Sequence, residues 1–275
     1  MKPAVSLIIA VYNAVRYLEL IFEALGRQSM TGFEVIVADD GSGPGIAGLV
    51  ERERARGRFP VRHLWHEDAG FRKNVMLNLA IRESASEYLV FIDGDCVPHR
   101  DFLRDHAATR QPGRVLCGRR VNLGKSFSER LTAGDVASGA IERLSLKVLA
   151  DGIAGRSTNL EDGIRIGSPW LRKLLSRREA RILGCNFSVE KSLLVAVNGF
   201  DEDYRAPGRG EDSDIAFRLE LIGARLEPLR NFGIVYHLWH PPTVVGEVNR
   251  DLHERVMRER NPVCRNGLVK HPGSG

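Results

Sequence analysis

Strand-like runs that alternate with helical segments constrain the fold of this chain more than any other feature of its sequence. The runs at 5–12, 33–38, 61–65 and 88–92 are dominated by apolar and aromatic residues, and the first is nearly continuous, as in a strand buried on both faces. Between the runs, the spacing of apolar residues predicts helices over 17–28, 46–57 and 72–84. This alternation predicts a doubly wound α/β sheet with right-handed crossovers.

The second half of the chain is less regular. Within 119–183 the sequence predicts several helices, one of them over 130–149. Beyond this insertion, it predicts strands over 184–189 and 234–237 and helices over 190–197, 212–223 and 250–259.

The composition is that of a folded globular protein. Of the 275 residues, 43% are hydrophobic and 27% are charged, which excludes disordered, collagen-like and fibrous proteins. The four cysteines are far apart, so we expect free thiols in a reducing compartment rather than a zinc site or a disulfide framework. The short apolar start lacks a cleavage region and no segment reaches transmembrane length, so we expect a cytoplasmic protein.

Acidic clusters follow the second and fourth predicted strands. Asp39 and Asp40 come after 33–38, and Asp93, Gly94 and Asp95 come after 88–92. In doubly wound sheets ligands bind beyond the carboxyl ends of the strands, so both clusters lie where a site is expected. The second cluster suits Mg²⁺ or Mn²⁺ bound to a diphosphate, and the first suits a nucleotide base or ribose. Each cluster would also serve as an ordinary turn.

Three further groups extend this candidate site. Arg72 opens the helix at 72–84, where its guanidinium and the main-chain amides suit phosphate. Glu211 and Asp212 precede the helix at 212–223, where they would cap it or, in one case, take a proton from a hydroxyl group. His237 and His240 close the last strand, and one metal ligand is expected rather than two because i and i+3 face opposite sides of a strand.

In this order, the motifs resemble those of the inverting nucleotide-sugar glycosyltransferases of family 2, which have the fold known as GT-A. The matching pieces are the opening run from Val5 to Asn13, the Asp39-Asp40-Gly41-Ser42 turn and the Asp93-Gly94-Asp95 turn. The stretch at 199–219 is similar to the carboxyl-terminal part of β-galactosyltransferases and chondroitin polymerases. The resemblance covers 3–118 and 182–242 and leaves out 119–181, where acceptor specificity is expected.

The resemblance implies a nucleotide-sugar site near the first four strands. Asp40 would contact the base, usually uracil, and Asp39 the neighbouring ribose, while Asp93 would reach the ribose or a metal-bound water. Ala10 departs from the pattern, because some relatives carry a hydroxyl residue near the base at this position. The remaining members expected at this site are Tyr12, Asn13, Arg72 and Gly94.

The resemblance also implies a metal ion and a catalytic pair. Asp95 would bind Mn²⁺ or Mg²⁺, with His237 as a third contact and His240 as the alternative. Asp212 would act as the catalytic base, and Glu211 would bind the acceptor.

These roles describe a metal-dependent inverting glycosyltransferase. It would move a sugar from a nucleotide diphosphate sugar, with UDP-sugar expected, to a hydroxyl of a glycan or lipid-linked acceptor in cell-surface polysaccharide or lipopolysaccharide synthesis. The chain would divide into a nucleotide-sugar-binding half at 1–118, an acceptor-binding and catalytic half at 119–250 with a helical insertion at 119–183, and a C-terminal helix and tail at 251–275.

Two alternatives remain open. A sugar-1-phosphate nucleotidyltransferase also combines an α/β sheet with acidic metal ligands, but it would carry a glycine-rich basic loop after the first strand, where this chain has Val11, Tyr12 and Asn13. The other alternative is a non-catalytic nucleotide- or glycan-binding module.

The net charge of +5 is concentrated in one segment. Residues 165–181 hold six basic side chains against one acidic side chain, which accounts for the whole excess. Trp170, Leu171 and Leu174 lie among them, so we hypothesise a basic amphipathic helix that contacts an anionic acceptor or the inner face of an anionic membrane. A solvated helix with buried leucines explains the pattern equally well. No nucleic-acid partner is expected, because the arginines at 52–58 alternate with acidic or uncharged residues.

Overall fold

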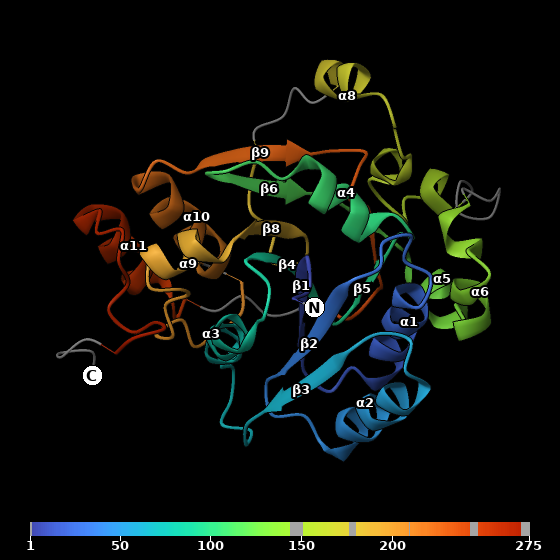
Figure 1. Ribbon diagram of the computed structural model, residues 1–275, viewed down its shortest axis with the longest axis horizontal. Coiled ribbons are helices and arrows are strands. Elements are labelled where there is room, and N and C mark those ends of the chain that lie inside the picture. The colour runs from blue at the N-terminus through green and yellow to red at the C-terminus, as the bar shows by residue number, and fades with distance from the viewer. Residues whose placement is uncertain (1, 144–150, 176–179, 209, 243–246, 271–275) are drawn as a thin grey trace.

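Seven strands form one mixed sheet at the centre of the computed structural model, which describes residues 2–143, 151–175, 180–208, 210–242 and 247–270 (Figure 1). The strand order is β3-β2-β1-β4-β8-β6-β9, and the first four strands are parallel. Their bounds confirm the predicted alternation and are β1 Val5–Val11, β2 Phe33–Asp39, β3 Val61–Trp65 and β4 Tyr88–Asp93.

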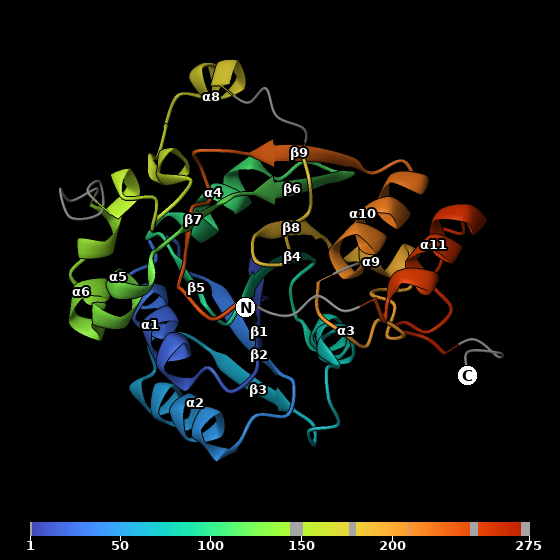
Figure 2. The same cartoon turned by 180° about the vertical axis from the view of Figure 1, so that it is seen from behind.

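Residue parity along the strands explains why helices cover both faces of the sheet. In β1, Leu7 and Ile9 pack into one apolar cluster, and Ile8 between them packs into another on the opposite face. The first cluster includes residues of α1 Val15–Leu25 and α2 Pro44–Arg56. The second includes residues of α3 Lys73–Glu83, α9 Lys191–Ala196 and α10 Glu211–Leu221. Figures 1 and 2 show these two groups of helices on opposite sides of the sheet.

The second half of the chain joins the same sheet through β8 Phe187–Glu190, β6 Arg114–Gly118 and β9 Arg225–Leu229. β8 runs antiparallel to β4, and this register stacks the Phe91 and Phe187 rings with centroids 4.5 Å apart. β6 pairs antiparallel with β8 and parallel with β9. The catalytic and nucleotide-binding halves expected from the sequence therefore share one sheet.

A small second sheet lies at the carboxyl ends of the central strands. It contains β5 Cys96–Pro98, β10 Val235–His237 and β7 Arg120–Asn122 in the order β5-β10-β7. Because β5 directly follows the Asp93-Gly94-Asp95 turn, this sheet brings the end of β10 to Asp95, where Leu238 N–H donates to the Asp95 carbonyl oxygen at 2.9 Å.

The insertion contains several short helices instead of the predicted long one. α5 Lys125–Arg130 and α6 Ala133–Ala137 are separated by Leu131 and Thr132, and Thr132 starts α6 with a reciprocal capping box to Asp135. The prediction of one helix across 130–149 is therefore wrong for 130–143, and 144–150 lie outside the described residues. The remaining described helices are η1 Ala140–Glu142, η2 Leu160–Gly163, α8 Pro169–Leu175, α4 Phe102–Thr109 and α11 Arg250–Glu259, the last as predicted.

α8 stands apart from the rest of the protein in both views (Figures 1 and 2). It exposes Trp170, Leu171 and Leu174 by 72%, 37% and 48%, so these apolar side chains are not buried in the core. Two of the basic side chains expected on this helix face, Arg165 and Arg172, contact other parts of the protein instead. Arg165 forms an ion pair with Asp105 at 2.6 Å, and the Arg172 guanidinium lies 3.8 Å from the centre of the Phe232 ring. Residues 176–179 lie outside the described part of the chain.

None of the helices in the described ranges combines the length and the apolar character needed to cross a bilayer.

Candidate active site

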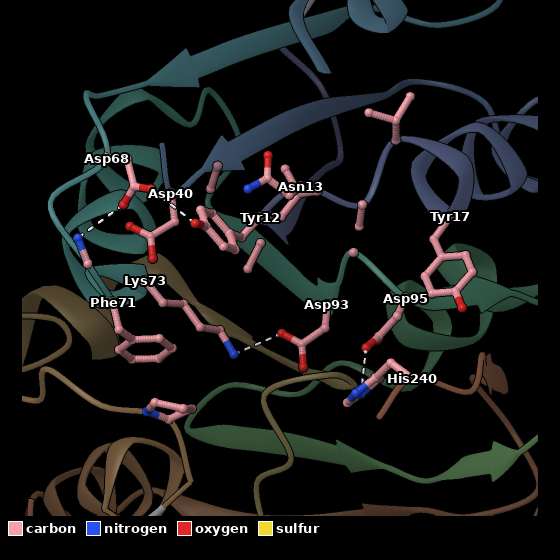
Figure 3. Close-up of a pocket in the computed structure, with 18 of the residues that line it drawn as sticks. Tyr12, Asn13, Tyr17, Asp40, Asp68, Phe71, Lys73, Asp93, Asp95 and His240 are labelled. Atoms are coloured by element: carbon pink, nitrogen blue, oxygen red, sulfur yellow. Dashed lines mark hydrogen bonds and ion pairs between the residues drawn. The ribbon is translucent and has the colours of Figure 1, made fainter. Parts of the chain in front are cut away.

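The carboxyl ends of β1, β2 and β4 open into a cavity of about 910 Å³ (Figure 3). Most of the residues selected from the sequence line it, and they come from segments far apart along the chain. These residues are Ala10, Tyr12, Asn13, Asp40, Asp93, Gly94, Asp95, Glu211 and His240. Asp39, Arg72, Asp212 and His237 are not among the lining residues.

Gly94 allows the two acidic residues on either side of it to reach the cavity. The parallel register places Asp93 beside Ala10, and Gly94 N–H donates to the Ala10 carbonyl oxygen at 2.6 Å. A Cβ at Gly94 would lie 2.9 Å from Val11 Cγ2 and 3.0 Å from the Ala10 carbonyl oxygen. Only glycine therefore lets β4 turn this tightly against β1 before β5 begins.

Lys73 brings a positive charge to the acidic side of the cavity, a role that the sequence did not distinguish from that of its neighbour Arg72. Its Nζ lies 2.8 Å from Asp93 Oδ1 (Figure 3) and 3.8 Å from Glu211 Oε1, so it joins the end of β4 to the start of α10. Burial alone lowers the pKa of Lys73, but Asp93, Glu211 and Asp212 outweigh burial and raise it well above its usual value.

Arg72, selected from the sequence for phosphate, is exposed, and its contact with the site is through the main chain. Its N–H donates to Asp40 Oδ2 at 2.9 Å. Charge alone does not tell which of two neighbouring basic residues at the start of a helix faces the cavity, because the turn of the helix decides the direction of each side chain.

Glu211 and Asp212 begin α10 with carboxyl groups of unusual basicity. Burial raises the pKa of Glu211 to about 7 and also raises that of Asp212, and Lys73 offsets part of each rise. Glu211 Oε2 is buried without a hydrogen-bond partner, and Asp212 Oδ2 accepts the Gly184 N–H at 2.7 Å. This arrangement can bind or remove a proton near neutral pH.

Asp95, His237 and His240 offer three ligand atoms that lie within 4.8 Å of one another. Asp95 Oδ2 lies 3.4 Å from His237 Nε2 and 3.2 Å from His240 Nε2. β10 ends at His237, so His240 is free of the strand's alternation and both rings reach the carboxylate. The sequence favours one histidine ligand because two would need the chain to leave the strand after His237, and in the structure it does so, which leaves both rings beside Asp95. Burial alone raises the pKa of Asp95, but the two rings outweigh burial and hold it well below its usual value.

The adjacent acidic residues at the end of β2 face different surroundings. Asp40 lines the cavity and accepts hydrogen bonds from Arg72 N–H and His66. Asp39 is fully buried, with Oδ1 accepting Ser42 N–H at 2.9 Å and Oδ2 lying 2.8 Å from His63 Nε2. The structure therefore places Asp39 in the support of the β2 turn instead of on the cavity wall, because successive residues of a strand point to opposite faces.

Tyr12 and Asn13 form the wall that follows β1. Tyr12 Oη donates to Asp68 Oδ2 at 3.0 Å, and Asp68 also lines the cavity. Asn13 has a φ of 49° and accepts Gly43 N–H at 3.1 Å through Oδ1, which ties the β1 and β2 turns together. Asp68 carried no sequence signal, because it lies in an irregular segment between β3 and α3.

Comparison with known proteins agrees with this architecture. The family described as "Glycosyl transferase family 2" matches residues 6–165, more than half of the chain. The chain belongs to glycosyltransferase family 2. Residues 174–241 match a second family, described as "N-terminal domain of galactosyltransferase". Both matches confirm the resemblance read from the motifs.

Its curated relatives are longer proteins. The chain is 22% identical over 273 residues to chondroitin synthase from Pasteurella multocida, covering 94% of this chain and 27% of that protein. It is 34% identical over 94 residues to the putative glycosyltransferase EpsH from Bacillus subtilis, covering 34% of this chain and 26% of that protein.

Solved structures confirm the GT-A fold. The S. aureus TarS structure in complex with UDP-GlcNAc matches with a TM-score of 0.57 and 19% identity, covering 93% of this chain and 65% of that one. A mannosyltransferase from Pyrobaculum calidifontis, in complex with GDP-Man and Mn²⁺, matches with a TM-score of 0.57 and 18% identity, covering 86% of this chain and 57% of that one.

The position of Lys73 predicts how the acidic pair titrates. Lys73 lowers the pKa of Glu211 and of Asp212, so Lys73→Met should raise both values above those of the unmodified protein. Carbon-detected NMR titration of the carboxyl groups measures this shift, with Arg72→Met as the matched control because Arg72 is exposed. An unchanged or lower Glu211 pKa in Lys73→Met would contradict the assignment.

Proposed function

We propose that this chain catalyses metal-dependent inverting transfer of a sugar from a UDP-sugar to a hydroxyl group of a glycan or lipid-linked acceptor. The observation that carries the proposal is that one cavity is lined by Asp40, by Asp95 and His240 of the Asp95–His237–His240 cluster, and by Glu211, the chain neighbour of Asp212. A base-binding carboxylate, a metal-binding cluster and a proton acceptor are the three parts that this reaction requires.

The first four strands and their turns, within 1–118, form the proposed donor half, and 119–250 the proposed acceptor half. Asp40, which lines the cavity, would accept the N3–H of uracil, and Lys73, at the start of α3, would contact the diphosphate or the sugar. The TarS complex supports this reading of the donor, because its ligand is UDP-GlcNAc. The similarity to chondroitin synthase supports a glycan product, with cell-surface polysaccharide or lipopolysaccharide as the proposed class.

The residues around Asp95 fit a divalent metal ion. One carboxylate and two imidazoles form a donor set suited to Mn²⁺, and Mg²⁺ is the alternative when oxygen ligands complete the shell. Bound between these residues and the donor, the metal would neutralise negative charge on the departing diphosphate. The Mn²⁺ in the mannosyltransferase structure supports this proposal.

Asp212 is the proposed general base. Its buried carboxylate takes the proton of the acceptor hydroxyl while the hydroxyl oxygen attacks the anomeric carbon of the sugar. The bond between that carbon and the diphosphate oxygen breaks, and the diphosphate leaves with the electron pair. One displacement inverts the anomeric configuration. Glu211, which lines the cavity, would bind the acceptor.

The reaction is proposed to occur in the cytoplasm, at the inner face of the membrane. The four cysteines are free and buried, as suits a reducing compartment. The exposed apolar residues of α8 and the basic sequence around them support peripheral contact with anionic lipid.

Replacing the base should separate binding from transfer. Asp212→Asn keeps the shape of the side chain but cannot accept the proton, so transfer should fall by about 10²- to 10⁴-fold. Binding of UDP in the presence of Mn²⁺ should stay within error. Transfer is measured as UDP release from a panel of UDP-sugars with glycan acceptors, and Glu220→Gln, exposed on the same helix, is the control. Full transfer by Asp212→Asn would remove it as the base, and pyrophosphate release by the unmodified protein would indicate a nucleotidyltransferase.

Replacing the cluster residues should weaken metal binding. Asp95→Asn, His237→Ala and His240→Ala should each lower the affinity for Mn²⁺ in the presence of UDP on the order of tenfold or more, since each removes a ligand. Electron paramagnetic resonance of free Mn²⁺ measures this directly and needs no turnover. His253→Ala on α11 is the control, and an unchanged affinity in all three variants would refute the site.

The α8 surface should bind anionic lipid. The protein should sediment at low salt with vesicles of phosphatidylglycerol and phosphatidylcholine but not with phosphatidylcholine alone. The double variant Trp170→Ser/Leu174→Ser should lose this binding, whereas Val195→Ser, exposed by 55% on α9, should keep it. Failure of the unmodified protein to sediment would reject membrane contact and leave the proposed reaction intact.

A further inference from the structure

Two histidine–aspartate contacts stand next to each other at the ends of β2 and β3. His63 Nε2 lies 2.8 Å from Asp39 Oδ2, and His66 Nε2 lies 2.8 Å from Asp40 Oδ1. They differ in what the carboxylate faces, since Asp40 lines the cavity and Asp39 does not. His66 therefore touches a residue of the site without lining the cavity itself.

Asp40 is held from two directions. His66 contacts Oδ1, and the Arg72 N–H donates to Oδ2 at 2.9 Å. Because an ionised carboxylate only accepts hydrogen bonds, the proton of this contact lies on His66 Nε2. Each oxygen keeps one free lone-pair direction, and the plane of the carboxylate is set by the two existing bonds.

The segment that carries His66 is itself fixed against the β2 turn. Gly41 has a φ of 89°, and a Cβ at this position would lie 2.6 Å from the Asp68 Cα. Tyr12 Oη holds the same segment through Asp68 Oδ2. The His66 ring thus belongs to a docked loop, so its contact with Asp40 can orient the carboxylate.

We propose that His66 is a positioning residue that aims Asp40 at the edge of the donor base and thereby sets the preference for uracil over cytosine. Uracil presents an N3–H donor to a carboxylate, whereas cytosine presents an unprotonated N3 that the carboxylate repels. The preference between the two bases therefore depends on how well the carboxylate is aimed. This inference rests on the proposed UDP-sugar donor.

The test compares binding of UDP and CDP by calorimetry in the presence of Mn²⁺, for the unmodified protein and for His66→Gln and His66→Asn. The Gln amide nitrogen lies as many bonds from Cβ as His Nε2 and can replace its contact, whereas the Asn amide is one bond shorter and cannot reach Asp40. We expect His66→Asn to lower the ratio of UDP affinity to CDP affinity about tenfold, because it loses one charge-assisted hydrogen bond. His66→Gln should keep the ratio of the unmodified protein.

The matched control is His63→Asn, which removes the contact to a carboxylate that does not line the cavity and should leave the ratio unchanged. Thermal unfolding of each variant checks that a change in ratio does not follow a loss of structure, because weaker folding lowers both affinities together. An unchanged ratio in His66→Asn, or no preference in the unmodified protein, would overturn the inference while leaving UDP binding in place. Failure of the unmodified protein to bind UDP would overturn the proposed donor and this inference together.

Discussion

A single buried ammonium group allows acidic side chains from distant parts of the chain to share one cavity. Lys73 lies between Asp93 at the end of β4 and Glu211 at the start of α10, and Asp212 acts on it electrostatically. Carboxylates brought so close without a positive charge would repel one another or become protonated. The Lys73 ammonium group favours the ionised form of Glu211 and Asp212, whereas burial raises the pKa of Glu211 to about 7.

The helix that carries Lys73 also joins the two halves of the protein. Asn74 and Asn78, one turn apart on α3, donate to the carbonyl oxygens of Asp201 and Phe200 at 2.8 Å each. Phe200 N–H in turn donates to Asn78 Oδ1 at 2.9 Å. One face of α3 thus fixes the segment that leads into α10, while Arg72 and Lys73 at its start contact Asp40 and Glu211. The distance between the proposed donor and catalytic groups depends on this helix.

Much of the first half was predictable because buried parallel strands have a strong sequence pattern. β1 to β4, α2, α3 and the acidic turns lie within a residue or two of their predicted positions, whereas α1 ends three residues earlier than predicted. Parity alone assigns Ile8 and Ile9 to opposite faces. The three-residue strands β5, β7 and β10 are different. β5 and β7 were missed because so short a segment has no periodicity, and β10 begins one residue later than predicted.

The sequence by itself determined the family, the order of β1 to β4 along the chain and the identity of nine of the twenty residues that line the cavity. It did so because these properties depend on local periodicity and on motifs of a few adjacent residues. Only the tertiary structure decided that Lys73 and not Arg72 faces the acidic centre, that Asp40 and not Asp39 lines the cavity, and that both histidines reach Asp95. These positions depend on the direction in which each side chain leaves the main chain and on contacts between segments far apart in the sequence. Residue type and spacing determine neither.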